Sequence, residues 1–443
     1  MTYEEARGYL DYINKAGIIL GLESMEHLLD ELGNPQDQLK FIHIAGTNGK
    51  GSVLAYLSTI LKEAGYKVGR YISPTLFSYR ERIQVNEEYI SREAVSCYVE
   101  KIKQAVERMQ EKGMSVPTIF EVETAMAFLH FVDKKCDIVV LETGMGGDTD
   151  ATNVIRTTVM EVLVSISKDH TAFLGNTLAE IAGHKAGIIK PGTVVVSAKQ
   201  DPEAMEVIQA KANQCNAVLK VADWEKAEEI TYGLEEQRFS YGEDKDICIH
   251  LGGSYQIKNA VIACVCVQAM RELGYQISDA QMRSGFAKTV WNGRFTVIRK
   301  DPMVLIDGAH NPDGAAELER SICQCLSDQK IYGICGVFKD KEYEKIVQIL
   351  CPSAKRVYTV DLPNKERTLP AEKLAECVRD CMAEQMDVYT EKSIGDAVAK
   401  AYTYATEDRG KRVVIACGSL SYLSEVIQCV ERCVQNPQRK ERI

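Results

Sequence analysis

The stretch FIHIAGTNGKGS, residues 41–52, decides the fold of this chain. An apolar run, 41–45, leads into a glycine-rich turn, and a helical pattern follows over 53–66. Glycines in such a turn let backbone N–H groups converge on an oxyanion, and the helix start adds positive potential. In a loop of this kind Lys50 reaches the terminal phosphates and Ser52 holds a magnesium ion, although Gly51 separates the two, unlike in the standard P-loop. The predicted nucleoside triphosphate loop comprises Gly46, Thr47, Asn48, Gly49, Lys50, Gly51 and Ser52.

Length and composition describe an ordinary globular chain. At roughly 150 residues per domain, the 443 residues predict two or three domains. Hydrophobic residues make up 45% and charged residues 26% of the chain, which is enough for a large core. The formal charge of −10 disfavours nonspecific nucleic-acid binding, which requires a basic surface. Local groups must therefore attract an anionic nucleotide.

The fifteen cysteines raise the question of disulfides or a zinc site. No C-x-x-C occurs, and the pairs Cys377/Cys381 and Cys429/Cys433 have helical spacing within apolar patterns, so we expect buried free thiols. The first residues lack the pattern of a signal peptide, and no apolar run reaches the roughly 18 residues of a membrane span. We therefore expect a cytoplasmic protein with no membrane partner.

Strand-like apolar runs alternate with helical patterns, which predicts an α/β domain with a mainly parallel sheet. We expect a less regular polar stretch around 222–255, followed by a helix over 256–275. A second alternation begins near residue 303 and predicts a smaller Rossmann-like α/β domain at the C-terminus, with the boundary near 291–299. The strands expected in the first domain are 41–45, 67–72, 137–142, 159–166 and 193–198.

Several polar residues follow these strands, where ligands gather in open α/β sheets. Glu142, His170 and Ser73 are possible magnesium ligands. On the residues alone, Glu142 is equally well a turn-bonding carboxylate, His170 a loop histidine and Ser73 part of a turn before Pro74. Each of these alternatives is open at this level.

Other candidates have equally plain structural interpretations. Lys185 ends a helix that starts with a capping box, and Phe120 is an aromatic residue of a kind that usually packs in a core. Arg294 offers five donors suited to ribose and phosphate oxygens, or is a surface residue near a linker. The segment from Asp307 to Pro312 follows a strand and suits an Asx turn.

Taken together, the motifs resemble the folylpolyglutamate synthase/dihydrofolate synthase branch of the Mur ligase superfamily, nearly end to end. They are GTNGKGS (46–52), GIILGLESMEHLLDELGNPQ (17–36), YISPTLFSYRERIQVN (71–86), TIFEVETAMAF (118–128), LETGMGGDTDATNVI (141–155), DHTAFLGNTLAEIAGHKAGIIKPG (169–192), WNGRF (291–295), DGAHNP (307–312) and CGSLSYL (417–423). The resemblance implies a P-loop ATP-binding and folate-binding domain, 1–296, and a Rossmann-like ligase domain, 297–443. It also implies an active site in the cleft between them.

The resemblance assigns roles to individual residues. It implies magnesium ligands at Ser52, Ser73, Glu142, His170 and at Lys185 as a carbamate. It implies nucleotide contacts at Asn259, Arg294 and Asp307, and a role for His310 on the phosphate side. Lys50, His170, Lys185 and His310 are the implied catalytic residues. Thr118, Phe120, Asp150, Ala151 and Ser419 are the implied substrate and cleft residues.

The sequence departs from the family's usual pattern at a few places. Asp148-Thr149 replaces Arg-Leu before DATN, so an anion takes the place of a cation beside anionic substrates. Gly183-His184 replaces Arg-Glu before Lys185. We expect Asp148 to disfavour the extra carboxylate of a folate.

The resemblance predicts a monomeric, ATP- and Mg²⁺-dependent ligase that joins L-glutamate to dihydropteroate, to reduced folates or to both, through an acyl phosphate. The alternatives are another Mur-type acid–amino-acid ligase and a nucleotide-binding switch without ligase chemistry. The absence of a dedicated substrate domain before the P-loop speaks against a peptidoglycan precursor ligase. A switch would explain 41–52 but not the set Glu142, His170 and Lys185.

Overall fold

The computed structural model describes residues 1–14, 21–381, 386–408 and 410–435, so the first four residues of the motif 17–36 lie outside the described residues. The chain forms two compact units. Unit 1 comprises Met1–Glu228, Ser240–Ile247 and Lys258–Thr289. Unit 2 comprises Glu229–Phe239, Cys248–Ile257 and the chain from Val290 onward.

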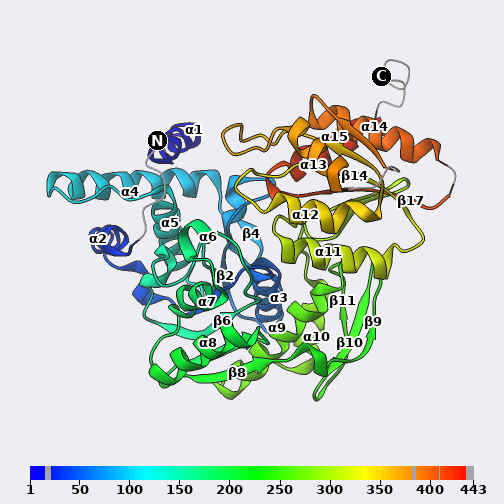
Figure 1. Cartoon of the computed structure of the whole chain (residues 1–443). Helices are drawn as coiled ribbons and strands as arrows, with labels where there is room; N and C mark the ends of the chain where they lie inside the picture. The colour runs from blue at the N-terminus through cyan, green and yellow to red at the C-terminus, as the bar shows by residue number, and fades with distance from the viewer. Residues whose placement is uncertain (15–20, 382–385, 409, 436–443) are drawn as a thin grey trace. The chain divides into compact units, whose positions relative to one another are not determined.

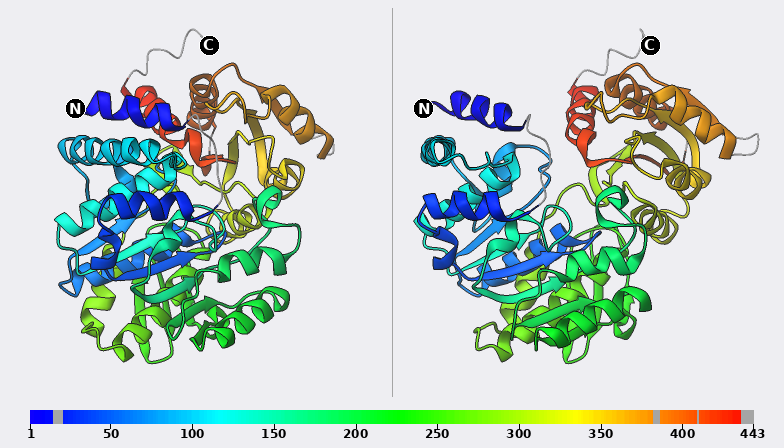
Figure 2. Two further views of the ribbon diagram at one scale, coloured as in Figure 1. Left: turned by 90° about the vertical axis from the view of Figure 1, so that its left-hand side faces the viewer. Right: turned by 60° about the vertical axis from the view of Figure 1, so that its left-hand side comes forward.

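Unit 1 is built on an eight-stranded sheet (Figures 1 and 2), in the order β4-β3-β2-β5-β1-β6-β7-β8. All neighbours from β2 to β8 pair in parallel, and β3 and β4 add an antiparallel edge. The strands are β1 (Phe41–Ala45), β2 (Val68–Tyr71), β3 (Ile83–Val85), β4 (Glu88–Tyr89), β5 (Ile138–Glu142), β6 (Thr158–Leu163), β7 (Val194–Ala198) and β8 (Val218–Ala222). The mainly parallel sheet predicted from the sequence is confirmed.

The helices of unit 1 fall on both faces of this sheet. Helix α3 connects β1 to β2 in one direction along the sheet, and α5 leads back to β5 in the other. Because parallel crossovers are right-handed, opposite directions place the two helices on opposite faces. The helices are α1 (Tyr3–Ile13), α2 (Glu23–Glu31), η2 (Pro35–Gln38), α3 (Lys50–Glu63), η3 (Tyr79–Arg82), α4 (Arg92–Glu111), α5 (Ile119–Asp133), η4 (Ala151–Val154), α6 (Thr171–Leu174), α7 (Leu178–Ala186), α8 (Pro202–Gln214), η5 (Trp224–Lys226), α9 (Tyr255–Glu272, whose first residues belong to unit 2) and α10 (Asp279–Lys288).

Two buried clusters hold these helices to the sheet. Leu10 of α1, Leu28 of α2 and Val99 of α4 pack in one cluster with Phe128 of α5. Ile181 of α7 packs in the other, together with residues of α8 and β7. Burial of such side chains contributes roughly 1.5–3 kcal/mol each, and this term stabilises the arrangement that places the strand ends.

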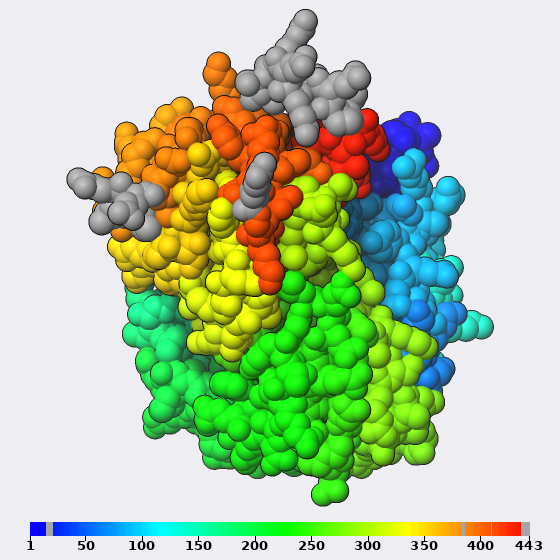
Figure 3. All heavy atoms as spheres, turned by 90° about the vertical axis from the view of Figure 1, so that its right-hand side faces the viewer, coloured from blue at the N-terminus to red at the C-terminus, as the bar shows by residue number. Residues whose placement is uncertain are grey.

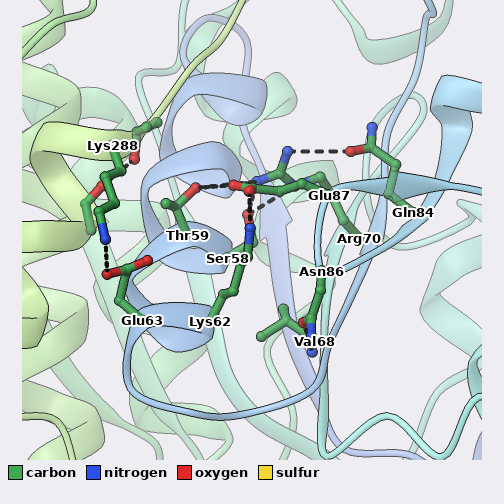
Figure 4. A network of polar contacts seen from close by, with 12 residues as sticks. Ser58, Thr59, Lys62, Glu63, Val68, Arg70, Gln84, Asn86, Glu87 and Lys288 are labelled. Carbon is green, nitrogen blue, oxygen red and sulfur yellow. Dashed lines mark hydrogen bonds and ion pairs between the residues drawn. The ribbon is translucent and has the colours of Figure 1, made fainter.

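A buried arginine joins α3 to the β2–β3 edge (Figure 4). Arg70 donates to Ser58 Oγ through Nη2 at 2.6 Å, and the same nitrogen lies 3.3 Å from Glu87 Oε1. Glu87 also accepts from Thr59 and from Lys62, both at 2.6 Å. Burial lowers the pKa of Arg70 to about 10, and Glu87 opposes this shift. The glutamate therefore compensates a charge that has lost its hydration.

Unit 2 contains a six-stranded sheet in the order β12-β13-β17-β14-β15-β16, parallel except for the β12–β13 pair. This confirms the predicted second α/β domain. Strands β12 and β16 were not predicted, because both are short and mostly half-exposed. The elements are β12 (Thr296–Lys300), β13 (Met303–Ile306), α11 (Pro312–Cys325), β14 (Lys330–Cys335), α12 (Tyr343–Leu350), η6 (Cys351–Ser353), β15 (Ala354–Thr359), α13 (Ala371–Cys381), β16 (Asp387–Thr390), α14 (Ile394–Glu407), β17 (Arg412–Cys417), η7 (Leu420–Tyr422) and α15 (Leu423–Gln435).

The expectation of a less regular stretch at 222–255 is wrong. The stretch forms a three-stranded sheet from β9 (Glu228–Thr231), β10 (Gln237–Tyr241) and β11 (Asp244–Ile249). Buried Phe239, Ile247 and Ile249 alternate with more polar residues, and Gly242 turns the chain with φ of +57°. This period-two pattern around a glycine is a hairpin signal that the polar composition obscured. The chain near residue 200 and these strands make up much of the green surface in Figure 3.

All fifteen cysteines are free thiols. Cys429 is buried, but Cys377, Cys381 and Cys433 are half-buried, so the expected full burial is wrong for these three. Among the residues that the structure describes, no helix is long and apolar enough to cross a membrane.

Candidate functional site

The glycine-rich loop that the sequence predicts to bind phosphate connects β1 to α3. Its first two glycines leave no room for a side chain. A Cβ on Gly46 would lie 2.2 Å from Val164 Cγ2, and one on Gly49 would lie 2.5 Å from Asn259 Oδ1. Both have positive φ, +147° and +101°, which L side chains rarely adopt. The structure thus brings the predicted adenine-contacting asparagine against the loop.

Helix α3 begins at Lys50, and its first backbone bond runs from Val53 N to Gly49 O at 2.9 Å. The N–H groups of Lys50, Gly51 and Ser52 precede that bond, so they are the groups a helix start offers to an anion. The Ser52 side chain is buried in this first turn.

Lys50 bends back over its own loop. Its Nζ donates to Gly46 O at 3.2 Å and to Thr47 O at 3.4 Å. The same nitrogen lies 3.9 Å from Glu142 Oε1. Thr47 fastens the loop to the chain beyond β6, because Thr47 N donates to Ser165 O at 2.7 Å. The Lys50 ammonium is thus held between the carbonyl groups of the loop and the Glu142 carboxylate.

Glu142 reaches this loop through the register of the sheet. Ile44 of β1 pairs with Glu142 of β5, and Tyr71 of β2 pairs with Leu141. The carboxyl ends of these parallel strands therefore meet at one edge. Glu142 is buried, and its Oε2 accepts from Ser73 N at 3.5 Å. The structure brings these two predicted ligands together.

Lys185 lies on the last turn of α7, whose capping box at Thr177 and Glu180 is present as predicted. Its side chain is turned inward and not to solvent, with 4% exposure, and Nζ donates to Gly46 O at 2.8 Å. Burial, and then the nearby Lys50 cation, lower the pKa of Lys185 to about 7. A large share of the amine is therefore neutral and nucleophilic near neutral pH.

His170 occupies a different environment. It is exposed and precedes α6 in the left-handed region, with φ of +51°. The carboxylate of Asp169, the residue before His170, raises the pKa of Lys185 electrostatically. Asp169 therefore lies within electrostatic range of Lys185, while the metal role of His170 stays a prediction.

The substrate candidates meet at the loop that follows β5. Phe120 is half-buried, and a Cβ on Gly144 would lie 2.6 Å from its Cζ. Asp150 is buried, accepts from Met145 N at 2.8 Å, and has its pKa raised by burial. Ala151, also buried, begins η4 directly after it. Thr118 instead serves as the N-cap of α5.

A buried histidine that the sequence analysis did not select stands behind Asp150. His43 Nε2 lies 2.8 Å from Thr152 Oγ1, which donates to Asp150 Oδ1 at 2.6 Å. Burial lowers the pKa of His43 to about 3, so it is neutral and Nε2–H is the donor. The sequence offered one signal for this role, because His43 is a polar residue inside the apolar run 41–45.

The two departures from the family pattern also meet. Nδ1 of His184 lies 3.0 Å from both carboxylate oxygens of Asp148. The carboxylate that was expected to face a substrate alone therefore has a partner.

Unit 2 gathers its predicted residues around Asp307. This buried carboxylate accepts from Ala309 N at 2.7 Å, Phe295 N at 2.8 Å and Tyr255 Oη at 2.7 Å. Burial raises the pKa of Asp307, and the nearby Arg294 guanidinium opposes the shift. Tyr255 was missed, because nothing in its local sequence links it to a residue 52 positions away.

The remaining candidates of unit 2 make local contacts. A Cβ on Gly308 would lie 2.2 Å from Arg294 Nη1, so the guanidinium rests on that glycine. His310 Nδ1 donates to Gly308 O at 2.8 Å. Ser419 is buried and caps η7 by accepting from Ser421 N at 3.2 Å.

The residues at the strand ends suit a magnesium ion. Hydroxyl and carboxylate oxygens are the ligands this ion prefers, usually one or two carboxylates with phosphate oxygens and water. Glu142 supplies a buried carboxylate beside Ser73 and within 3.9 Å of the phosphate-loop lysine. The donor set fits the ion.

A phosphate-binding α/β unit with a second α/β unit is the architecture of a Mur-type ligase. Residues 44–267 match the Mur ligase middle domain, and residues 293–420 match the Mur ligase, glutamate ligase domain. The dihydrofolate synthase/folylpolyglutamate synthase of Bacillus subtilis (strain 168) is 34% identical over 438 residues, covering 96% of this chain and 98% of that protein. The folylpolyglutamate synthase of Lacticaseibacillus casei is 36% identical over 380 residues, covering 84% and 88%.

Solved structures agree with these matches. The Mycobacterium tuberculosis folylpolyglutamate synthase complexed with ADP superimposes with a TM-score of 0.87 at 32% identity, covering 98% of each chain. A folylpolyglutamate synthase complex with AMPPCP and folate gives 0.83 at 31% identity, covering 97% and 100%. The chain therefore belongs to the folylpolyglutamate synthase/dihydrofolate synthase family of Mur ligases, which confirms the resemblance read from the sequence.

Proposed function

We propose that this enzyme uses ATP to join L-glutamate to dihydropteroate and to reduced folates. The observation that carries the proposal is the convergence of Lys50, Glu142 and Lys185 on one phosphate-binding loop, with Lys50 and Lys185 both bonded to Gly46 O. A nucleotide switch needs only the loop. A phosphoryl-transfer enzyme needs the surrounding charges as well.

The proposed reaction has two steps. A carboxylate oxygen of the acid attacks the γ-phosphorus of ATP, the bond to the β-phosphate oxygen breaks, and ADP leaves. The amine of glutamate then attacks the acyl carbon, phosphate leaves and the amine loses a proton. Lys50 would move from Gly46 O to the transferring phosphoryl group, where its charge stabilises the transition state.

Magnesium, held by Ser52, Ser73, Glu142, His170 and a carbamate on Lys185, would neutralise phosphate charge. The carbamate would form when the neutral Nζ attacks carbon dioxide and releases one proton. The pKa of Lys185, about 7, favours this reaction because the amine need not first be stripped of a tightly held proton. The product is an anion on a side chain that already reaches the phosphate loop.

For the acid, we propose a pterin site formed by the face of Phe120 and the carboxylate of Asp150, with Ala151 and Thr118 beside them. A pterin offers a flat ring and N–H donors that match these groups. His43 and Thr152 orient Asp150 from behind. Dihydropteroate and reduced folates share the pterin end, so one site can serve both.

In unit 2 we propose nucleotide contacts at Arg294 and Asp307, a role on the phosphate side for His310, and a substrate role for Ser419. Asn259 of unit 1 would contact the adenine. The arginine suits this role because its guanidinium is already fixed against Gly308. We propose that the enzyme acts as a monomer in the cytoplasm, consistent with fifteen free thiols.

A coupled assay tests the function. Purified enzyme with ATP, magnesium and glutamate is given dihydropteroate, a reduced folate or no acid, and phosphate and amide product are measured. We expect acid- and glutamate-dependent phosphate release with both acids. Product from only one acid would refute bifunctionality. Release without any acid, or only with an unrelated acid, would refute the folate ligase assignment.

A further inference from the structure

Several hydrogen bonds join the end of α7 to the loop after β5, and one of them connects the side chains of Asp148 and His184. Nδ1 of His184 lies 3.0 Å from both Oδ1 and Oδ2 of Asp148. Because an ionised carboxylate only accepts hydrogen bonds, Nδ1–H is the donor. The backbone of the same pair is joined too, since Asp148 N donates to His184 O at 2.9 Å. Side chain and main chain therefore hold the same two points together.

The contact between loop and helix is backbone against backbone. A Cβ on Gly147 would lie 2.6 Å from His184 O and 2.9 Å from Lys185 O. One on Gly187 would lie 2.3 Å from Asp148 Cβ. The Asn153 amide also joins the two segments, because its Nδ2 donates to Asp148 O at 3.1 Å and to Gly187 O at 3.3 Å. A shift of Asp148 would therefore pass to the backbone of Lys185, because closely packed interiors transmit strain.

We propose that Asp148 and His184 form a positioning pair that directs Lys185 at the phosphate-binding loop. Lys185 follows His184 directly, and its Nζ reaches Gly46 O at 2.8 Å from the turn that the pair holds. The side chains of Asp148 and His184 are 39% and 38% exposed. The pair therefore lies outside the buried Lys185 that it orients. The inference rests on the proposed function of Lys185 and adds two residues to it.

The pair also changes the expectation for Asp148. Taken alone, its charge was expected to repel the extra carboxylate of a folate. With His184 donating to both oxygens, the carboxylate is already engaged. Replacing Asp148 alone by arginine should therefore not improve folate use, because it places a cation against the imidazole and removes the carboxylate that accepts from His184 Nδ1.

A charge-exchange cycle tests the proposal with Asp148→Arg, His184→Glu and the double variant. The partial exposure of both side chains gives the longer arginine room to extend. Asp148→Arg places a cation against the imidazole, and His184→Glu places two carboxylates side by side. Both variants lose the hydrogen bond between the two side chains. The double variant restores an opposite pair with bidentate geometry.

We expect kcat to fall about tenfold or more in each single variant, since displacement of a reacting group by about 1 Å costs up to about 10²-fold. KM for the acid should stay near that of the unaltered enzyme. The double variant should recover most of the loss, the sign of a coupled pair.

A second readout is independent of turnover. In carbon-13 bicarbonate, the carbamate signal of Lys185 should weaken in the single variants and return in the double variant. Glu272→Gln is the matched control, because Glu272 forms an exposed ion pair with Lys220 at 2.8 Å in the same unit. It should change neither kcat nor the carbamate signal.

Unchanged kcat in both single variants would overturn the proposal, as would a double variant no better than the worse single one. If the single variants fail to fold, Asp148→Asn and His184→Gln replace them. We expect kcat to fall in both, because each change weakens the bond between the two side chains. An unaltered enzyme without glutamate-dependent phosphate release would instead refute the proposed function, so the two failures are distinguishable.

Discussion

Replacing Lys185 by methionine should make the stability of this protein less dependent on pH. Lys185 is buried, and its ordinary pKa of 10.5 falls to about 7 in the folded chain. Between these two values the unfolded chain binds a proton that the folded chain does not, so the lysine costs stability there. The cost is complete below about pH 7 and disappears as the pH rises to that of the unfolded lysine. Methionine is similar in length and carries no charge.

The pKa difference sets the size of the effect. A shift from 10.5 to about 7 corresponds to about 5 kcal/mol of differential stability at low pH. At about pH 7 the folded lysine is half protonated and the cost is about 4 kcal/mol, and near pH 9.5 it is about 1 kcal/mol. The stability of the unaltered enzyme relative to the Lys185→Met variant should therefore rise by about 3 kcal/mol over this interval.

Urea unfolding of both proteins at several pH values measures this difference, because other titrating groups cancel between them. The buffers must be free of carbon dioxide, so that the amine stays unmodified. Added bicarbonate should then stabilise the unaltered enzyme and not the variant, since modification of the folded form shifts the unfolding equilibrium. A stability difference that does not change with pH would refute the reasoning. The variant should also lose nearly all ligase activity.

Three further outcomes follow from the loop and its surroundings. Lys50→Ala should lower kcat by about 10²–10³ while the fold is retained, and near-normal turnover would contradict its role at the phosphoryl group. Gly49→Ala should raise KM for ATP about tenfold, because a Cβ there would meet Asn259 Oδ1 at 2.5 Å and φ is +101°. An unchanged KM would count against the loop as a tight cradle. Glu87→Gln should destabilise unit 1 by about 1–3 kcal/mol in urea unfolding, because buried Arg70 loses its charged partner.

Much of the fold was predictable because its signals are local. The strand 41–45, the turn and the helix after it follow from apolar patterning and glycine, and all three are present. The sheet 228–249 was missed because its polar composition obscured the alternation of Phe239, Ile247 and Ile249 with more polar residues. The edge strand Thr296–Lys300 was missed for a similar reason, since most of its residues are half-buried.

The candidate site likewise contains some residues that the local sequence identifies and others that only distant contacts reveal. The predicted phosphate loop is identifiable because its glycines, its lysine and its serine all lie within the short stretch 46–52. Tyr255 and His43 were not identified, because each acts on a residue far away in the chain, Asp307 and Thr152. A lone tyrosine or histidine in an apolar run carries no sign of its distant partner.

The sequence by itself therefore determined the α/β class, the glycine-rich loop between β1 and α3 and the family, since periodicity, glycine and short motifs act over a few residues. The tertiary structure alone decided that Lys185 reaches Gly46, 139 residues away, and that its amine is buried. It also decided that Asp148 has His184 as a partner. The physical reason is that parallel strands separated in the chain end at the same edge, and burial there sets both which groups meet and how they hold their protons.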